Sequence, residues 1–482
     1  MKKYIIKTSL LFSALAFLSG CNTSDMNTDP NSFYSAKPET LVTYSQKALG
    51  DYLNTPSVNT NNFRLVMQYW QEASYADESN YDFVTRNISN SVWQANYRDV
   101  LQNLVQAKDI INKYQPTPSE LATWPGVKKN QLAVIDILQC IVFGDMVDTF
   151  GDVPYKAAND LAGNPLPAYD KAADIYTDLI ARVTKDIADL DTSFASFGNA
   201  DVIYKGSPGQ WKKFGNSLLL KFGITLADAN PSLAKSTIDK AIAGGVFASA
   251  SDSALLPYEI AAPNFNQLYQ NLKASGRNDF VGAVTLINSM KASNDPRISA
   301  YYQPTKSGEY IGAPIGITAS FATQSHIGMF GYTPNTPGTI LTYTEVAFYL
   351  AEVAARWNPA QAPAAYQNAV KASFKEWGYT DADANTYIAS KPYDATNWKK
   401  SIGDQAWVAM YNQPNVSWNF WKRLDYPTLT APPTAVSQAE GKVPVRLQYP
   451  VRETTTNPSN YAAAAAAIGG DKLTTKVFWD KN

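Results

Sequence analysis

Apolar side chains recur three or four residues apart along most of this chain after residue 38. Leu132, Ile135, Leu138, Val142 and Met146 form one such series. Because an α-helix turns once every 3.6 residues or so, this spacing places the apolar side chains on one face of a helix. The alternating pattern typical of strands is sparse. The sequence therefore predicts an all-α fold whose helices pack through their apolar faces.

The same periodicity locates the individual helices and the loops between them. It predicts helices at about 38–54, 61–78, 88–114, 129–149, 170–193, 208–229, 232–243, 279–292, 343–357, 362–377 and 397–412, with a short one at 462–467. The stretches 294–341 and 425–460 are rich in Gly, Pro, Ser and Thr, and we expect long structured loops there, with little β structure beyond a short hairpin. Loops of this length in a compact domain usually carry function.

Two of the predicted helix pairs resemble each other. In the first pair an apolar stripe extends from Trp211 to Phe222, and in the second it begins at Tyr343. The 34 residues from Tyr343 to Trp377 match the period of tetratricopeptide repeats. Two copies do not establish a repeat array, but they favour antiparallel helix pairs stacked into a right-handed scaffold.

The first twenty residues have the pattern of a secretory signal peptide. Three lysines within the first seven residues precede an apolar run at 10–18, which is too short to span a membrane. Leu18-Ser19-Gly20-Cys21 is typical of a bacterial lipobox, so we expect Cys21 to carry acyl chains that anchor the protein to a membrane. The alternative is an ordinary signal peptide with an accidental cysteine.

Composition narrows the classes of function. The formal net charge of −1 gives no basic excess for nucleic-acid binding. If Cys21 carries lipid, Cys140 has no disulfide partner and is expected to be a small buried residue. With His326 as the single histidine there is no zinc-binding constellation. We expect a signal peptide at 1–20, a lipidated tether at 21–37 and one helical domain at 38–482.

Several short segments together resemble one known family. They are Asp25–Asn31, Phe150-Gly151-Asp152-Val153-Pro154-Tyr155, Gln210–Leu218, Asn294-Asp295-Pro296-Arg297-Ile298, Thr344–Glu352, Trp421-Lys422-Arg423-Leu424-Asp425-Tyr426-Pro427 and Arg446–Pro450. Their order over nearly the full length resembles the SusD/RagB family of nutrient-binding surface lipoproteins from Bacteroidetes, in particular its SusD-like branch. Leu424-Asp425 departs mildly from the Thr-Gly common in that family.

The resemblance implies a fold, a location and partners. It implies an all-α fold on four tetratricopeptide-like helix pairs, anchored by lipid in the outer membrane and facing the cell exterior. It implies a SusC-like TonB-dependent transporter as partner, over which the protein forms a lid. The ligand would be an oligosaccharide or, in some members, a peptide. No enzymatic activity, cofactor or metal is implied.

Aromatic residues are abundant, and many lie among polar neighbours. Sugar rings present apolar faces and polar edges, so their binders combine flat aromatic side chains with amide or charged groups. The stretch 68–83 has this mixture, and we predict that Trp70, Tyr75, Asn80 and Tyr81 contact the ligand. The alternative is that these aromatic residues pack a helix against its neighbours.

A second candidate region is the loop stretch 301–332. Its aromatic residues show no helical period, and we predict that Tyr302 and Phe321 contact the ligand. His326 in the same stretch is expected to be a hydrogen-bonding loop residue. Near the C-terminus, by contrast, the aromatic residues at 418–421 are expected to be core, with Lys422 and Arg423 in ion pairs.

Catalytic motifs are absent from the sequence. No GxSxG, HExxH, P-loop or DxDxDG pattern occurs. The carboxylate pairs Asp77/Glu78 and Glu345/Glu352 leave a helical-barrel glycoside hydrolase as an alternative, although the first is typical of a solvated helix end and the second includes a residue that continues a helix stripe. The sequence also allows a peptide-binding lid or a purely structural lid.

Overall fold

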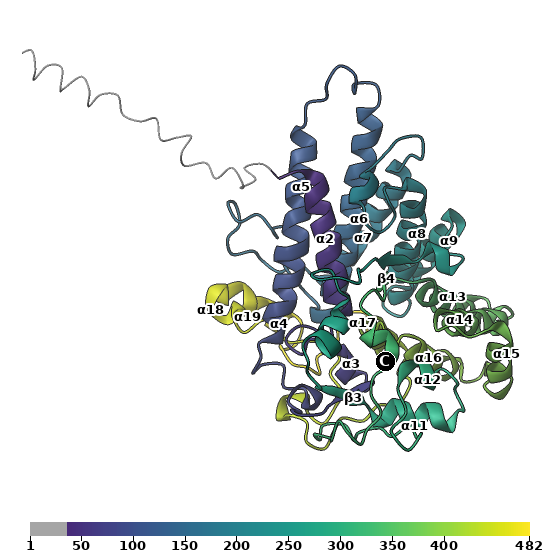
Figure 1. Cartoon of the computed structure of the whole chain (residues 1–482). Coiled ribbons are helices and arrows are strands. Elements are labelled where there is room, and N and C mark those ends of the chain that lie inside the picture. Colours follow the sequence, from purple (N-terminus) through teal and green to yellow (C-terminus); the bar gives the residue numbers. More distant parts are fainter. Residues whose placement is uncertain (1–35) are drawn as a thin grey trace, which may run out of the picture. The chain divides into compact units, whose positions relative to one another are not determined.

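A computed structural model describes residues 36–482 (Figure 1). The predicted signal peptide, the lipidation site Cys21 and the tether up to residue 35 lie outside the described residues. Residues 38–482 form one compact unit. Within the described residues, no helix has both the length and the apolar character needed to cross a membrane.

The first half of the chain is almost entirely helical. Its elements are α2 (Pro38–Asn54), α3 (Phe63–Val66), β1 (Trp70–Glu72), η1 (Glu78–Asn80), α4 (Ile88–Trp93), η2 (Gln94–Leu101), α5 (Gln102–Lys113), α6 (Trp124–Phe150), α7 (Ala172–Asp189), η3 (Gly198–Ala200), α8 (Pro208–Thr225) and α9 (Pro231–Gly244). The segment η2 is a π-helix that joins α4 to α5 without a break.

Short strands and longer connections separate the helices of the second half. Its elements are η4 (Ala250–Asp252), β2 (Ala254–Leu256), α10 (Gln267–Tyr269), η5 (Gln270–Ala274), β3 (Phe280–Gly282), α11 (Val284–Ala292), α12 (Ile298–Tyr301), η6 (Met329–Tyr332), β4 (Gly338–Leu341), α13 (Tyr343–Trp357), α14 (Ala362–Glu376), α15 (Asp381–Ser390), α16 (Trp398–Ala409), α17 (Pro414–Leu424), η7 (Ser437–Ala439), α18 (Glu453–Thr456) and α19 (Pro458–Ala467).

Packed helix pairs form the scaffold. α2 packs against α5, α6 against α7, α8 against α9 and α13 against α14, and Figure 1 shows the first of these pairs beside the long helix α6. The interior of α6 approaches α8 closely, since a Cβ atom at Gly144 would lie 2.6 Å from the ring of Phe222. The predicted all-α fold with helix pairs and little β structure is confirmed.

The predicted helix at 61–78 is wrong. The chain leaves α3 after one turn because Gln68 adopts a positive φ of 57°, which a continuing helix does not allow. The strand β1 follows and pairs antiparallel with β3, with Trp70 opposite Gly282. The helix predicted at 279–292 therefore begins only at Val284. A second two-stranded sheet joins β2 to β4.

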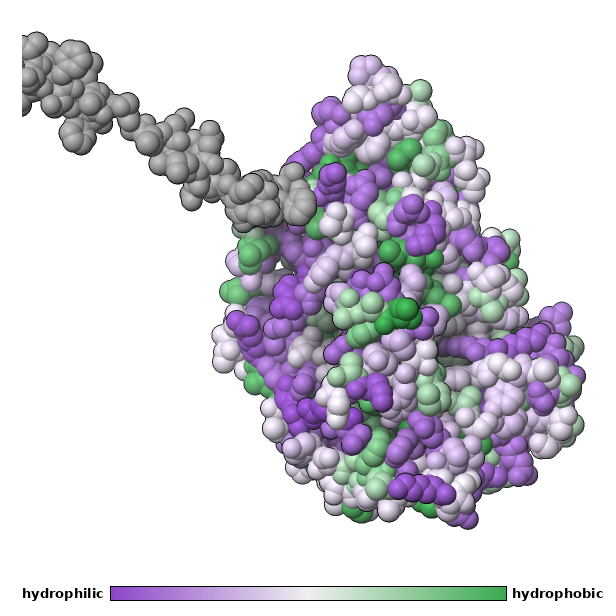
Figure 2. Space-filling view, in the orientation of Figure 1, coloured by the Kyte–Doolittle hydropathy of each residue, from purple (hydrophilic) through white to green (hydrophobic). Residues whose placement is uncertain are grey.

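The long helices bury ion pairs together with apolar side chains. Arg423 forms a salt bridge with Glu352 at 2.8 Å, as predicted. Lys422 instead donates to the carbonyl oxygen of Asp148 at 2.7 Å and lies over the ring of Trp418. Burial lowers the pKa of Lys422 to about 7. On the face shown in Figure 2, hydrophilic and hydrophobic residues alternate in small groups.

Candidate functional site

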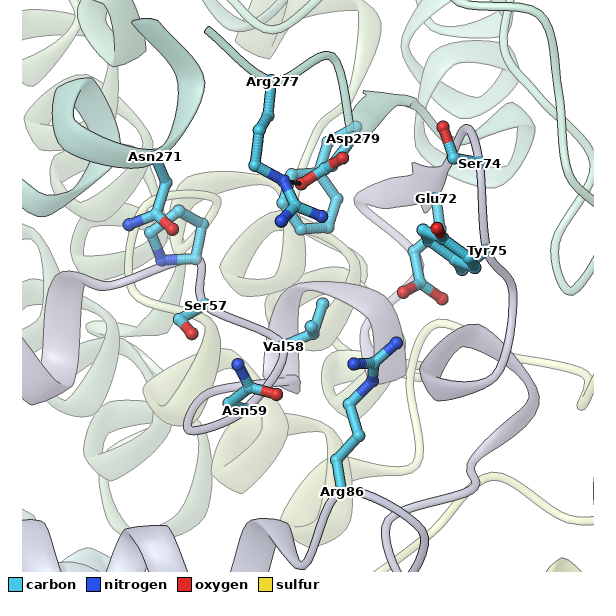
Figure 3. A pocket seen from close by; sticks show the side chains of 12 residues that line it. Ser57, Val58, Asn59, Glu72, Ser74, Tyr75, Arg86, Asn271, Arg277 and Asp279 are labelled. Carbon is cyan, nitrogen blue, oxygen red and sulfur yellow. Dashed lines mark hydrogen bonds and ion pairs between the residues drawn. The ribbon is translucent and has the colours of Figure 1, made fainter. Parts of the chain in front are cut away.

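A polar pocket lies beside the sheet formed by β1 and β3 (Figure 3). Its volume is about 120 Å³, which is small beside the roughly 300–1,000 Å³ of a typical small-molecule pocket. The residues that line it are Pro56, Ser57, Val58, Asn59, Glu72, Ser74, Tyr75, Arg86, Asn271, Arg277, Asp279 and Phe280.

The sheet brings together segments that are about two hundred residues apart in sequence. Glu72 pairs with Phe280 in the register of the two strands, and the amide of Ala73 donates to the carbonyl oxygen of Asp279 at 2.7 Å. Beyond Ala73 the chain turns outward, which leaves Tyr75 at the mouth of the pocket. The backbone pairing of β1 with β3 therefore sets the spacing between Tyr75 and Asp279.

Two guanidinium groups enter the pocket from opposite sides. Arg277 extends from one side and Arg86 from the other, as Figure 3 shows. Arg277 forms an ion pair with Asp279 at 2.5 Å, and Arg86 forms one with the buried Glu78. Because each guanidinium has several donors in a planar fork, an ion-paired arginine keeps N–H groups for a further acceptor.

A buried carboxyl group forms the floor. Glu72 accepts hydrogen bonds from the backbone amide of Ser79 at 2.8 Å and from its hydroxyl at 2.7 Å. Burial raises the pKa of Glu72 to about 8, and the neighbouring Glu78 contributes to the rise. Glu72 is therefore protonated at neutral pH, which removes the repulsion between two adjacent carboxylates.

The aromatic side chain at the mouth is accessible. Tyr75 is 58% exposed, whereas Phe280 on the opposite strand is buried. An exposed tyrosine presents a flat apolar face and a hydroxyl group. The pocket thus combines one open aromatic face with donors and acceptors from arginine, carboxyl, amide and hydroxyl side chains.

Three of the six predicted ligand contacts are buried. Trp70 packs on Phe280 and its indole N–H donates to the hydroxyl of Tyr411 at 2.9 Å. Tyr302 donates to the carbonyl oxygen of Tyr69 at 2.7 Å. The ring of Tyr81 is also fully buried. In this structure, the rings of Trp70, Tyr81 and Tyr302 present no face to solvent, and Trp70 packs behind the pocket residue Phe280.

The other three predicted residues are accessible to different degrees. Tyr75 lines the pocket. Asn80 is half-buried, and its side-chain amide donates to the carbonyl oxygens of Ala76 and Gly316 and accepts from Thr434. Phe321 is half-buried and stacks on His326 at 3.8 Å, outside the lining of this pocket. The structure therefore brings only Tyr75 of the six into the pocket lining.

Sequence reasoning missed most of the polar lining. Asn59, Arg86, Asn271, Arg277 and Asp279 were not among the predicted site residues. Arg277 and Asp279 do stand where a polar stretch gives way to the apolar strand β3. That boundary is a weak signal, because the pairing of β3 with β1 is not visible in either segment alone.

None of the four carboxylates considered for hydrolysis lines this pocket, and Asp77 is the one among them that is exposed. Glu345 accepts from Lys221 at 3.0 Å, and Glu352 is held by Arg423 and Arg356, all away from the pocket. Glu78 is buried against Arg86.

One cluster outside the pocket has the spacing of metal ligands. Within residues 36–482, the side chains of Asp136, Cys140 and Asp186 lie close enough together to hold a metal ion. Arg182 and Lys108 already bind the carboxylate of Asp136, so this cluster is an ion-pair network. Cys140 is buried, as predicted.

Comparison of the sequence with models of protein families gives a match to one family. The family model SusD-like, described as "Starch-binding associating with outer membrane", matches residues 30–450. No curated protein matches the chain.

Solved structures share the fold over almost the entire chain. A chitin-binding protein is 26% identical, with 92% of this chain and 100% of that chain covered and a TM-score of 0.80. A chitin-binding SusD homologue from Flavobacterium johnsoniae is 23% identical, with 92% and 99% covered and a TM-score of 0.77. A SusD homologue from Bacteroides uniformis is also 23% identical, with the same coverage and a TM-score of 0.76.

Proposed function

Because the chain belongs to the SusD-like family of starch-binding proteins that associate with the outer membrane, we propose that it binds an oligosaccharide in the pocket beside β1 and β3. The observation that carries this proposal is the exposed ring of Tyr75 next to a rim of charged and amide side chains. A neutral sugar needs both, since its ring faces are apolar and its edges carry hydroxyl groups.

The pocket residues divide into a platform and a polar rim. The ring of Tyr75 stacks against one sugar ring. Arg277, Arg86 and the amides of Asn59 and Asn271 bind the hydroxyl groups. The ion pair with the buried Glu78 holds the guanidinium group of Arg86 in place before ligand arrives, which lowers the entropy cost of binding.

The wider role follows from the family. We propose that acyl chains on Cys21 anchor the protein in the outer membrane, facing the exterior, and that the tether at 21–37 lets the domain swing over a SusC-like TonB-dependent transporter. The oligosaccharide captured in the pocket would then pass to that transporter. The family's association with the outer membrane supports this assignment.

We propose that the protein binds its ligand without cleaving it. Of the four carboxylates considered for hydrolysis, Glu78, Glu345 and Glu352 are buried in ion pairs, and Asp77 is exposed but outside the pocket lining. This arrangement supports the assignment. Incubating the purified protein with maltohexaose and chitohexaose and measuring new reducing ends tests it directly. Any turnover would overturn the binding role in favour of hydrolysis.

The binding site is tested with a matched set of tyrosine variants. Tyr75→Ala should lower the affinity for the better-bound hexasaccharide about tenfold, which is roughly 1.4 kcal/mol, because stacking area is lost. Tyr75→Phe keeps the ring and should bind nearly as well. Tyr44→Ala removes a comparably exposed tyrosine from α2, outside the pocket, and serves as the control. Isothermal titration calorimetry measures each affinity. Unchanged affinity in Tyr75→Ala would overturn the assignment of this pocket.

A further inference from the structure

A second, larger cavity lies where the π-helical segment η2 faces the loop at 154–167. Its volume is about 420 Å³, within the range of pockets that hold small ligands. None of its lining residues lines the pocket beside β1 and β3. Those that matter for a ligand are Trp93, Tyr97, Gln102, Leu161, Asn164 and Leu166.

One wall of this cavity is aromatic and rigid. The rings of Trp93 and Tyr97 lie 5.1 Å apart, and the hydroxyl of Tyr97 donates to the carbonyl oxygen of Pro154 at 2.6 Å. Phe150 and Tyr169 pack on the other sides of the Trp93 indole. Because π-helical turns are often found at functional sites, the placement of Tyr97 on η2 is itself informative.

The opposite wall is an apolar loop that the π-helix holds in place. Leu161 is 81% exposed and Leu166 is 58% exposed, although both line the cavity. The amide of Asn159 donates to the carbonyl oxygen of Tyr97 at 2.8 Å and to the side chain of Gln102 at 3.1 Å. Two exposed leucines on a tethered loop are costly to leave in water unless something covers them.

The charged residues around the cavity already have hydrogen-bond or ion-pair partners within the protein. Arg98 forms an ion pair with Asp99, Asp160 accepts from Gly163 and Asn164 within its own loop, and Glu453 accepts from Tyr169. These groups are already hydrogen-bonded within the protein, and the wall between them is aromatic and apolar, which suits a neutral ligand.

One polar group remains without a partner. Within the described residues, the indole N–H of Trp93 is buried and has no hydrogen-bond acceptor. A buried donor without an acceptor costs about 1–3 kcal/mol. This N–H is not accessible from the cavity, so Trp93 offers a ligand the face of its indole ring and not this donor.

We propose that this cavity is a second binding site, which takes one ring of a neutral oligosaccharide. The apolar face of the ring lies between the aromatic wall and the two leucines. The side chains of Asn164 and Gln102, which line the cavity, bind the hydroxyl groups at the edge of the ring. The proposal shares only the class of ligand with the first pocket and does not depend on that pocket being used.

The test uses exposed residues, so that the fold is preserved. The purified protein is mixed in turn with maltohexaose, cellohexaose and chitohexaose, and hydrogen–deuterium exchange is followed in the segment 158–167. At least one hexasaccharide should protect this segment. The double variant Leu161→Asp/Leu166→Asp should lose that protection and the matching affinity about tenfold, while Leu121→Asp, at a comparably exposed leucine elsewhere, should not.

The two sites are separated by crossing the variants. Tyr75→Ala should leave the protection of 158–167 in place, and the double leucine variant should leave binding beside β1 and β3 in place. If the pocket beside β1 and β3 does not bind the ligand, Tyr75→Ala should leave the affinity unchanged. The second site is overturned if no hexasaccharide protects 158–167, or if the double variant keeps the protection.

Discussion

Charged side chains serve opposite purposes in the helical scaffold and in the pocket beside β1 and β3. In the scaffold, the side chains of Arg423 and Glu352 are 2% and 0% exposed. At the pocket, those of Arg277 and Asp279 are 61% and 30% exposed. A buried pair cannot release a partner without leaving a charge in the core, but an exposed pair exchanges partners with water at little cost. The difference identifies which arginines are free to bind a ligand.

The largest expected loss of stability comes from removing a buried ion pair of the helical scaffold. Arg423→Ala leaves the carboxylate of Glu352 with Arg356 alone in the core, and should lower the free energy of unfolding by about 3–5 kcal/mol. Chemical denaturation measures the loss. The exposed pair of Lys375 and Asp381 provides the control, since Lys375→Ala should cost less than about 1 kcal/mol. Equal losses in both variants would mean that burial does not distinguish these pairs.

A pH-dependent effect follows from the buried carboxyl group on the pocket floor. The pKa of Glu72 is raised from 4.5 to about 8, so the folded protein holds this proton more tightly than the unfolded chain. The resulting stability is complete below pH 4.5 and is lost as the pH rises through about 8. Glu72→Gln mimics the protonated group and should remove this loss, which is roughly 4 kcal/mol between pH 5 and pH 9.

Denaturation at several pH values measures the effect of Glu72→Gln. Asp279→Asn, which changes an exposed carboxylate at the rim, is the matched control and should keep the pH dependence of the wild type. If Glu72→Gln also kept that dependence, another group would be responsible for it.

The sequence predicts those elements of the fold that depend on residues close together in the chain, and fails where an element depends on residues far apart in the chain. Helices such as α2, α13 and α14 were predicted to within a residue or so, because their apolar periodicity and their caps are local. The side chain of Thr342, for example, accepts from the amide of Glu345 at the start of α13. The helix predicted at 61–78 was wrong, because β1 is formed by pairing with β3, which lies about two hundred residues away.

Contacts between distant segments also limited the prediction of the residues that line the pocket beside β1 and β3. Composition pointed to the stretch 68–83, and Tyr75 does lie at the mouth of the pocket. Tyr81 could not be distinguished from Tyr75 in the sequence, although one ring is buried and the other exposed. Arg277 was missed because its contribution depends on the sheet that places β3 beside β1. Burial and pairing are properties of the fold, and local patterns report them only indirectly.

A smaller effect concerns the loop contacts behind the pocket. The side chain of Asn80 joins three segments through Ala76, Gly316 and Thr434. Asn80→Ala should lower the free energy of unfolding by about 1–2 kcal/mol, because three hydrogen bonds are lost and the carbonyl oxygen of Gly316 keeps only the hydroxyl of Thr434, at 3.2 Å. Thr434→Val removes only one of these bonds and should cost less. If Asn80→Ala instead reduced hexasaccharide affinity without a loss of stability, Asn80 would belong to the rim that contacts the ligand.

The smallest expected effect on stability comes from an arginine-to-lysine substitution at the pocket, which is compared with the same substitution in the helical scaffold. Arg277→Lys keeps the positive charge but loses the planar fork that binds Asp279 and a ligand hydroxyl together. Because the pair is exposed, stability should change by less than about 0.5 kcal/mol, while hexasaccharide affinity should fall several-fold in calorimetry. Arg423→Lys should do the reverse, lowering stability and leaving affinity unchanged, since its partner Glu352 is buried away from the pocket. If Arg277→Lys lowered stability as much as Arg423→Lys does, the exposed pair would be part of the scaffold, and its guanidinium group would not be free for a sugar.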